Sequence, residues 1–147
     1  MTDALEAGRR MAKVVARYRD GRVVKGLSLD FTPFREHFHV AAAGGGLPER
    51  EVRLADLKGV FFVKDLEGDL GHAKSNLFDP QDRAPGRKVR IQFKDGEVLA
   101  GFSLDYLPVR PGFFLLPADR NANADRCYVL VAATARITVV DAPAEMR

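Results

Sequence analysis

The sequence predicts an all-β protein built from two tandem five-stranded small barrels that are related by internal duplication. The stretch Lys13–Val40 recurs as Lys88–Leu115, with 12 of 28 positions identical at a constant offset of 75 residues. Average amino-acid usage would give roughly two such matches by chance. Apolar and polar residues alternate through Lys88–Lys94, which is typical of a half-buried strand. Short apolar runs separated by turn-forming residues follow, so each copy is expected to hold five short strands.

Each copy begins with a predicted β-hairpin. An Asp-Gly dipeptide favours a two-residue type I′ turn, in which both central residues have positive φ. Such a turn places Tyr18 opposite Val23 and directs apolar residues of both strands to one face. The turn residues are Asp20, Gly21, Asp95 and Gly96. The predicted core residues are Val14, Tyr18, Val23, Leu27, Leu29, Leu54, Val60, Val89, Ile91, Phe93, Val98, Phe102, Leu104, Val129 and Ile137.

A glycine lies in the middle of the second strand of each predicted hairpin, at Gly26 and Gly101. A glycine inside a strand usually marks a bend or a close approach of another backbone segment. A long, bent second strand allows a five-stranded sheet to curl into a small barrel. The two glycines are therefore expected to shape the backbone.

Three further strands are expected in each copy, and they set the domain boundaries. The predicted strands are Phe38–Ala42, Glu51–Leu54, Lys58–Val63, Phe113–Leu116, Arg126–Leu130 and Arg136–Val140. The first domain covers residues 1–63, residues 64–87 form a linker rich in turn-forming residues, and the second domain covers residues 88–147. A short helix over Met1–Met11 is expected to precede the first strand, because Thr2 or Asp3 can cap it.

Composition and charge favour a cytoplasmic protein that does not enter the membrane. The 147 residues carry a net charge of +3 with a pI near 9.2, a mild excess of positive charge. Dedicated nucleic-acid binders usually concentrate positive charge more strongly, so no DNA partner is expected. No apolar run approaches the roughly 18 residues that span a bilayer. The single cysteine, Cys127, is expected to be a small apolar residue within a strand.

The hairpin and the strands after it resemble the Sm/LSm family of SH3-like small barrels. The family's first motif has an apolar strand, an Asp-Gly turn, a strand with a central glycine, and an Asp, which correspond here to Val14–Asp30 and Val89–Asp105. Its second motif has two short apolar strands around a basic residue and a glycine, similar to Leu54–Val63 with Lys58-Gly59. The resemblance implies a small barrel fold and the possibility of RNA binding. The repeated pattern also resembles an uncharacterised bacterial family, which implies no function.

A cluster of basic residues on the first hairpin is the main candidate for a ligand surface. Cationic side chains on one strand face could track phosphates, although an ordinary solvated face is the commoner outcome. The candidate RNA- or anion-binding residues are Arg17, Arg19, Arg22, Lys25, Lys58 and Gly59.

Other polar patterns favour structure over chemistry. His37 and His39 could place two metal ligands together, but two histidines alone seldom make a site, so no metal is expected. Asp30 and Asp105 recur in both copies, each five residues before an arginine, which favours a charge pair that braces a loop. No catalytic residues and no cofactor are expected.

The sequence thus favours a binding module without enzymatic activity. A protein partner or a homo-oligomer is the favoured partner, because the fold carries ordinary surface charge and no recognisable catalytic constellation. RNA binding through the basic surface of the first copy is the alternative. The two copies are expected to pack together or to join strand edges, with Phe62 and Phe114 as candidates for the interface between them.

Overall fold

A computed structural model describes residues 11–45, 48–67, 78, 85–119 and 121–140. This part of the chain contains ten strands and two short 3-10 turns, without any helix long and apolar enough to cross a membrane. The elements are β1 (Ala12–Tyr18), β2 (Val23–Ser28), β3 (His37–Val40), β4 (Arg50–Arg53), η1 (Leu54–Asp56), β5 (Leu57–Val63), β6 (Arg87–Phe93), β7 (Val98–Ser103), β8 (Gly112–Pro117), β9 (Ala124–Leu130), η2 (Val131–Ala133) and β10 (Thr134–Val139).

The fold is all-β, as predicted, and each half supplies five strands. We call residues 11–63 the first half and residues 87–140 the second half. Within the described residues the two halves correspond strand for strand, and each has its 3-10 turn between the fourth and fifth strands. The predicted helix over Met1–Met11 lies almost wholly outside the described residues, and Met11 itself has no regular structure. The linker at 64–87 is also described only in part.

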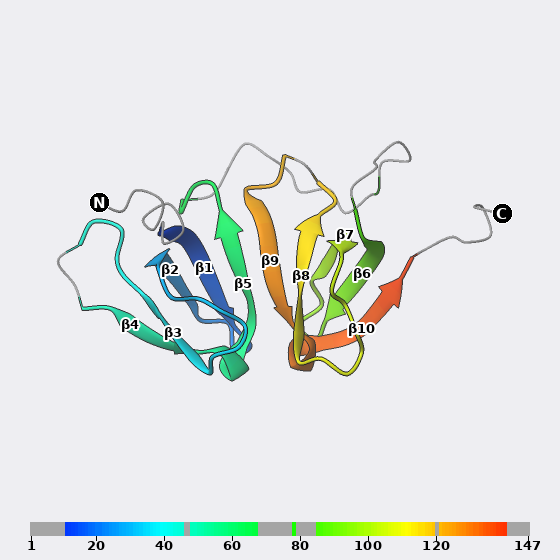
Figure 1. Cartoon of the computed structure of the whole chain (residues 1–147), viewed down its shortest axis with the longest axis horizontal. Coiled ribbons are helices and arrows are strands. Elements are labelled where there is room, and N and C mark those ends of the chain that lie inside the picture. Colours follow the sequence, from blue (N-terminus) through cyan, green and yellow to red (C-terminus); the bar gives the residue numbers. More distant parts are fainter. Residues whose placement is uncertain (1–10, 46–47, 68–77, 79–84, 120, 141–147) are drawn as a thin grey trace.

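The two halves share one sheet and do not form two separate closed barrels. Eight strands make a continuous antiparallel sheet in the order β10-β6-β7-β8-β9-β5-β1-β2 (Figure 1). The β3–β4 hairpin forms a second, two-stranded sheet, linked to β2 through the bridge between Leu27 and Ala41. The prediction of separate barrels is therefore wrong. The expectation that the copies join strand edges is confirmed, because β5 of the first half pairs with β9 of the second.

The hairpin turns are one residue longer than predicted. Tyr18 N–H donates to Arg22 O, so Tyr18 lies opposite Arg22, and Val23 lies opposite Arg17. Only the glycine of each Asp-Gly pair has positive φ, 98° at Gly21 and 96° at Gly96, which excludes type I′. The Asp20 carboxylate instead accepts the Arg22 backbone N–H (3.0 Å), and this local bond stabilises the longer turn.

This shift by one residue turns the second strand of each hairpin over, so that its two faces exchange sides. The prediction that Phe102 is buried holds nevertheless, at 3% exposure. The predicted core residues Val23, Leu29 and Leu104 are exposed, with 43%, 56% and 77% of their surface accessible. Val24 and Leu99 are buried in their place. The predictions for the first strands hold, because Val14, Tyr18, Val89, Ile91 and Phe93 are all buried.

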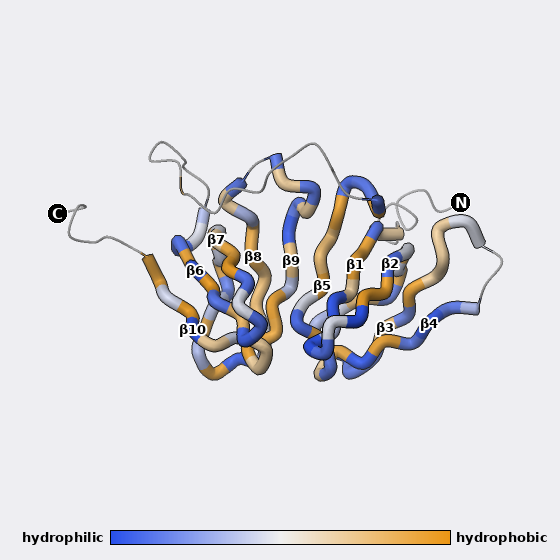
Figure 2. The backbone as a smooth tube through the Cα atoms, turned by 180° about the vertical axis from the view of Figure 1, so that it is seen from behind, coloured by the Kyte–Doolittle hydropathy of each residue, from blue (hydrophilic) through white to orange (hydrophobic). Residues whose placement is uncertain are grey.

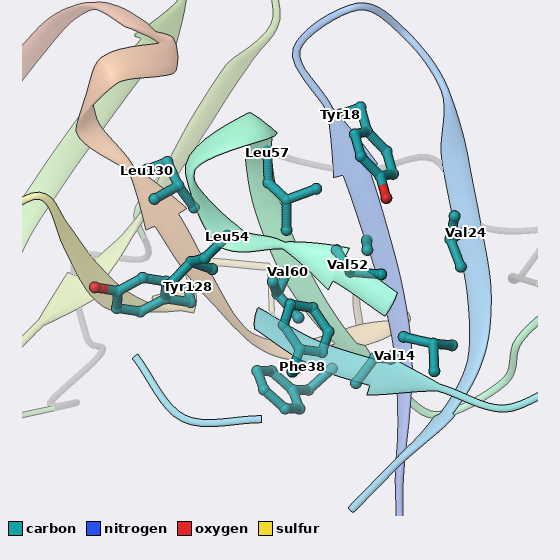
Figure 3. Close-up of a cluster of buried hydrophobic side chains, with 13 residues drawn as sticks. Val14, Tyr18, Val24, Phe38, Val52, Leu54, Leu57, Val60, Tyr128 and Leu130 are labelled. Carbon is teal, nitrogen blue, oxygen red and sulfur yellow. The ribbon is translucent and has the colours of Figure 1, made fainter. Parts of the chain in front are cut away.

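Two hydrophobic clusters form the core, and each receives side chains from both halves. Tyr128 and Leu130 of β9 lie in the cluster of the first half, where Figure 3 shows them on the side of Leu54. Phe61 of β5 lies in the cluster of the second half. Figure 2 shows how hydrophobic residues dominate β5 and β8, near the junction. The two cores are therefore completed across the β5–β9 pairing.

An aromatic group at this junction includes both predicted interface residues. Phe31 packs edge-on against four rings, and its centroid lies 5.4 Å from that of Phe62 and 6.5 Å from that of Phe114. The other two rings are Phe38 of the first half and Tyr128 of the second. The interface roles predicted for Phe62 and Phe114 are thus confirmed.

The mid-strand glycines allow a neighbouring backbone to approach closely. A Cβ atom at Gly26 would lie 2.1 Å from the Ala41 carbonyl oxygen, and one at Gly101 would lie 2.2 Å from that of Leu116. No side chain fits between these backbones, because both obstacles are main-chain atoms. The glycines are needed where the third strand of each half meets the second.

Replacing Gly26 by Ala is expected to lower the free energy of unfolding by about 2–3 kcal/mol, because β2 and Ala41 must separate. Gly44→Ala is the matched control, since a Cβ there meets nothing within 4 Å. Urea denaturation of both variants measures the difference. Equal stability of the two variants would contradict this account.

Candidate functional site: two clamped apolar loops

Each half carries a loop between its second and third strands whose tip is apolar and exposed. We call residues 29–36 the first tip loop and residues 104–111 the second tip loop. Each contains a turn closed by a backbone hydrogen bond, from Arg35 to Thr32 (3.4 Å) and from Arg110 to Leu107 (3.0 Å). A proline follows the first residue of each turn, where its fixed φ is favourable.

The residue after each proline points into solvent. Phe34 is 92% exposed in the first tip loop, and Val109 is 89% exposed in the second. Leu29 and Leu104, at the starts of the two loops, are exposed as well. Both halves therefore present large apolar side chains at corresponding positions, a pattern more typical of interaction surfaces than of isolated surface residues.

An aspartate clamps the start of each tip loop to the third strand. Asp30 Oδ1 accepts the Ser28 hydroxyl (3.3 Å) and the His39 backbone N–H (2.9 Å). In the second half, Asp105 Oδ1 accepts the Ser103 hydroxyl (3.1 Å) and the Phe114 N–H (3.0 Å). The predicted role of these aspartates as loop braces is correct in outline. The partners are a buried serine and a strand backbone, however, and not the predicted arginines.

The end of each tip loop is held to the 3-10 turn of its half. Leu54 N–H donates to Glu36 O (2.8 Å), and Val131 N–H donates to Pro111 O (2.9 Å). With both ends fixed, the loop backbone does not need to order when a partner binds. Less conformational entropy is then lost on binding.

Ser28, Asp30 and His39 have the residue types of a catalytic triad but not its geometry. In a triad the histidine lies between the serine and the aspartate, so that it can take the serine proton. Here Asp30 lies between the other two, and its Oδ2 is 2.7 Å from His39 Nδ1. Phe114 occupies the place of His39 in the second half, where the brace persists without a histidine. The group is therefore a structural brace.

The ion pair between Asp30 and His39 shifts the pKa values of both residues. The hydrogen bond with Asp30 raises the pKa of His39 above its ordinary 6.5, although burial opposes the shift. Burial pushes the pKa of Asp30 upward, but hydrogen bonds from the His39 ring and backbone outweigh it and hold that pKa below 3.8. Glu51 Oε2, 3.8 Å from His39 Nε2, adds negative charge on the other side of the ring.

The His39 pKa measured by NMR titration is expected to lie above 6.5 and to fall toward that value in Asp30→Asn. Because the pKa of His39 is raised and that of Asp30 is lowered, the pair stabilises the fold fully between pH about 3.8 and 6.5. The contribution is lost as pH rises through the folded pKa of His39 or falls through that of Asp30. Asp105→Asn is the matched control, since its carboxylate faces Phe114. An unchanged His39 pKa in Asp30→Asn would disprove the assignment.

A groove of about 350 Å³ lies between the halves beside the first tip loop. Its apolar lining includes Leu54 and Pro33 of the first half together with Pro111 and Leu130 of the second. Phe34 also lines this groove. The lining is complete only because the β5–β9 pairing brings the two halves together.

The predicted basic surface is only partly assembled. Arg17 and Lys25 are exposed on the same face of β1 and β2, and the Arg17 guanidinium lies over the Phe61 ring, 5.3 Å from its centroid. Arg19 is exposed at the turn. Arg22 is paired with Asp20 (2.9 Å) and stacks on Tyr18, so its charge is largely neutralised.

Lys58 and Gly59 do not join that surface, because both are buried at the junction between the halves. Lys58 Nζ donates to Asp95 Oδ2 (2.8 Å) and to Glu97, and it lies over the Phe93 ring. A Cβ at Gly59 would lie 2.9 Å from the Tyr128 carbonyl oxygen. Lys58 thus ties β5 of the first half to the hairpin turn of the second. Its hydrogen bond is the largest cause of the lowered pKa of Asp95.

Neutralising both carboxylates in Asp95→Asn/Glu97→Gln is expected to lower the free energy of unfolding by about 3 kcal/mol, because it leaves the buried Lys58 ammonium without counter-charge. Lys58→Met is expected to cost less, about 1 kcal/mol, since the freed carboxylates are partly exposed and can be hydrated. Adding Lys58→Met to the double variant should then restore stability. Chemical denaturation of the four proteins measures the cycle, and additive effects would contradict a coupled buried group.

The tip residues themselves were not singled out by the sequence. The predicted register, which is one residue out, places Leu29 and Leu104 in the core. The available signal was the repeated order of an aspartate, a proline, an apolar residue and an arginine in both copies. Among the residues the structure describes, no three His, Cys, Asp or Glu side chains are grouped to hold a metal ion.

These features define a class of small all-β protein in which two halves share a sheet and each clamps an apolar loop. The chain belongs to DUF6982, described as a family of unknown function, whose sequence profile matches residues 10–141. No curated protein and no solved structure matches the chain.

Proposed function

We propose that this protein is a binding module without enzymatic activity that recognises a protein partner through its two tip loops. The exposure of Phe34 and Val109 at corresponding positions of two clamped loops carries the proposal. Holding such side chains in water forgoes about 1.5–3 kcal/mol of burial energy each. A partner that covers them would recover that energy.

We also infer that the paired loops arose by duplication of one five-stranded unit of the Sm/SH3-like small-barrel kind. The 12 identities over 28 positions and the two equivalent aspartate braces support this inference. Duplication doubles the number of tip loops. Two linked contacts bind more tightly than either alone when one partner engages both.

RNA binding is the alternative, and Arg17 and Lys25 are the residues that favour it. Both are exposed on one face of the first hairpin, and Arg19 lies at its turn. Lys13 lies on the same face, and its Nζ donates a hydrogen bond to the Lys64 carbonyl oxygen (3.2 Å). This surface is small beside the usual basic footprint of nucleic-acid-binding domains, so a protein partner is the favoured proposal.

The variant Phe34→Ser/Val109→Ser is expected to weaken partner binding at least about tenfold, since two apolar anchors are lost. The partner is first captured from extract of the source cells, identified, purified and then titrated against each variant by calorimetry. Met11→Ser/Leu116→Ser is the matched control, because it removes apolar side chains that are exposed elsewhere.

A parallel titration with single-stranded RNA, at several salt concentrations, tests the alternative. Salt-dependent RNA binding that is lost in Arg17→Glu/Arg19→Glu/Lys25→Glu, but kept in the tip-loop variant, would replace the protein-partner proposal with RNA recognition. Retention of full partner affinity by the tip-loop variant would also reject the proposal.

A further inference from the structure

The groove between the halves has an apolar floor with Arg35 in its lining, and Arg110 directly precedes the lining residue Pro111. Leu54 and Leu130 form part of the floor and are themselves mostly buried. Arg35 directly follows the exposed Phe34, and Arg110 directly follows the exposed Val109. Each tip loop therefore presents the same pair, an apolar side chain and a guanidinium.

The two arginines are available to a ligand. Both are exposed, and neither forms an ion pair within the part of the chain that the structure describes. Arg53, the second basic residue of the groove lining, lies 3.5 Å from Asp56 and is partly neutralised. Glu36 is the acidic residue of the groove lining. The balance at the rim is positive, and guanidinium groups bind carboxylates through paired hydrogen bonds.

We propose that this groove binds an extended segment of a partner protein that carries apolar side chains flanked by carboxylates. The apolar side chains pack on Leu54, Pro111 and Leu130, beside Phe34. The flanking carboxylates pair with Arg35 and Arg110. The proposal rests on the function proposed above and adds the chemistry of the recognised segment.

The placement of the groove explains why both halves are needed for recognition. Most of the lining comes from the first tip loop and η1, and the second half contributes Pro111 and Leu130. Neither half alone offers the full lining. A segment lying across the groove would therefore contact an apolar surface and the guanidinium groups of Arg35 and Arg110. The shared sheet fixes the spacing of these two residues.

Three short capped peptides test the proposal by amide NMR titration of the full chain. The acetylated, amidated peptide Glu-Leu-Phe-Glu is expected to shift the amide signals of Leu54, Ala55 and Leu130. The corresponding peptide Lys-Leu-Phe-Lys should bind about fivefold more weakly, because it loses two exposed ion pairs. Glu-Ser-Ser-Glu, which lacks apolar side chains, should produce no saturable shifts in the groove.

The variant Arg35→Glu/Arg110→Glu should reverse the preference between the acidic and basic peptides. Arg17→Glu/Lys25→Glu is the control of equal net charge, with both substitutions outside the groove lining, and should keep the preference. Equal affinity for the acidic and basic peptides, or shifts confined to other surfaces, would overturn the proposal. So would Phe34-dependent binding to phosphatidylglycerol vesicles without peptide binding in the groove, which would assign the tips to a membrane surface.

The two proposals can fail separately. If the tip-loop variant loses a protein partner but no peptide occupies the groove, the binding function stands and the segment chemistry is rejected. If the peptides bind the groove as expected but the tip-loop variant keeps full partner affinity, the groove stands as a site and the role of the loop tips is rejected.

Discussion

The antiparallel pairing of β5 with β9 is the interaction on which the rest of the structure depends. It joins the halves into one sheet, and it also exchanges core side chains between them. Tyr128 and Leu130 complete the core of the first half, while Phe61 enters that of the second. The buried Lys58 adds a polar link to Asp95 and Glu97 across the same junction. Neither core is complete without the other half, so the halves are expected to fold as one cooperative unit.

The same junction explains why the series of strands ends after two halves. β4 corresponds to β9, because each directly precedes the 3-10 turn of its half. β10 corresponds to β5, because each directly follows that turn. Where β9 has Tyr128 and Leu130, β4 has the exposed Glu51 and Arg53. Where β5 has Phe61, β10 has the exposed Thr138. Charged and polar side chains of this kind protect a sheet edge from pairing with another chain.

The sequence predicted the strands well because each strand leaves a local signal. All ten strands were anticipated, and the first strand of each hairpin alternates clearly enough to identify its buried face. The register of the second strand could not be predicted, since it depends on whether Asp20 adopts positive φ or bonds to Arg22. Because the φ angle of the turn aspartate is not positive, the register differs from the predicted one, and Leu29 and Leu104 lie at the surface and not in the core. The prediction that Lys58 belongs to a ligand surface is wrong, because nothing nearby in the sequence reveals its counter-ions, 37 and 39 residues away.

The candidate site combines loop braces that both halves share with side chains that differ between the two loops. The shared serine–aspartate brace and the hydrogen bond to the 3-10 turn fix each loop, and these features are structural in both halves. A functional role is a better explanation for apolar side chains that a rigid loop holds in water, because folding alone favours their burial. Phe34 and Val109 meet that condition, because well-braced loops keep them in water. His39 replaces Phe114 at one brace only, so the two loops share a shape while one of them carries a titratable anchor.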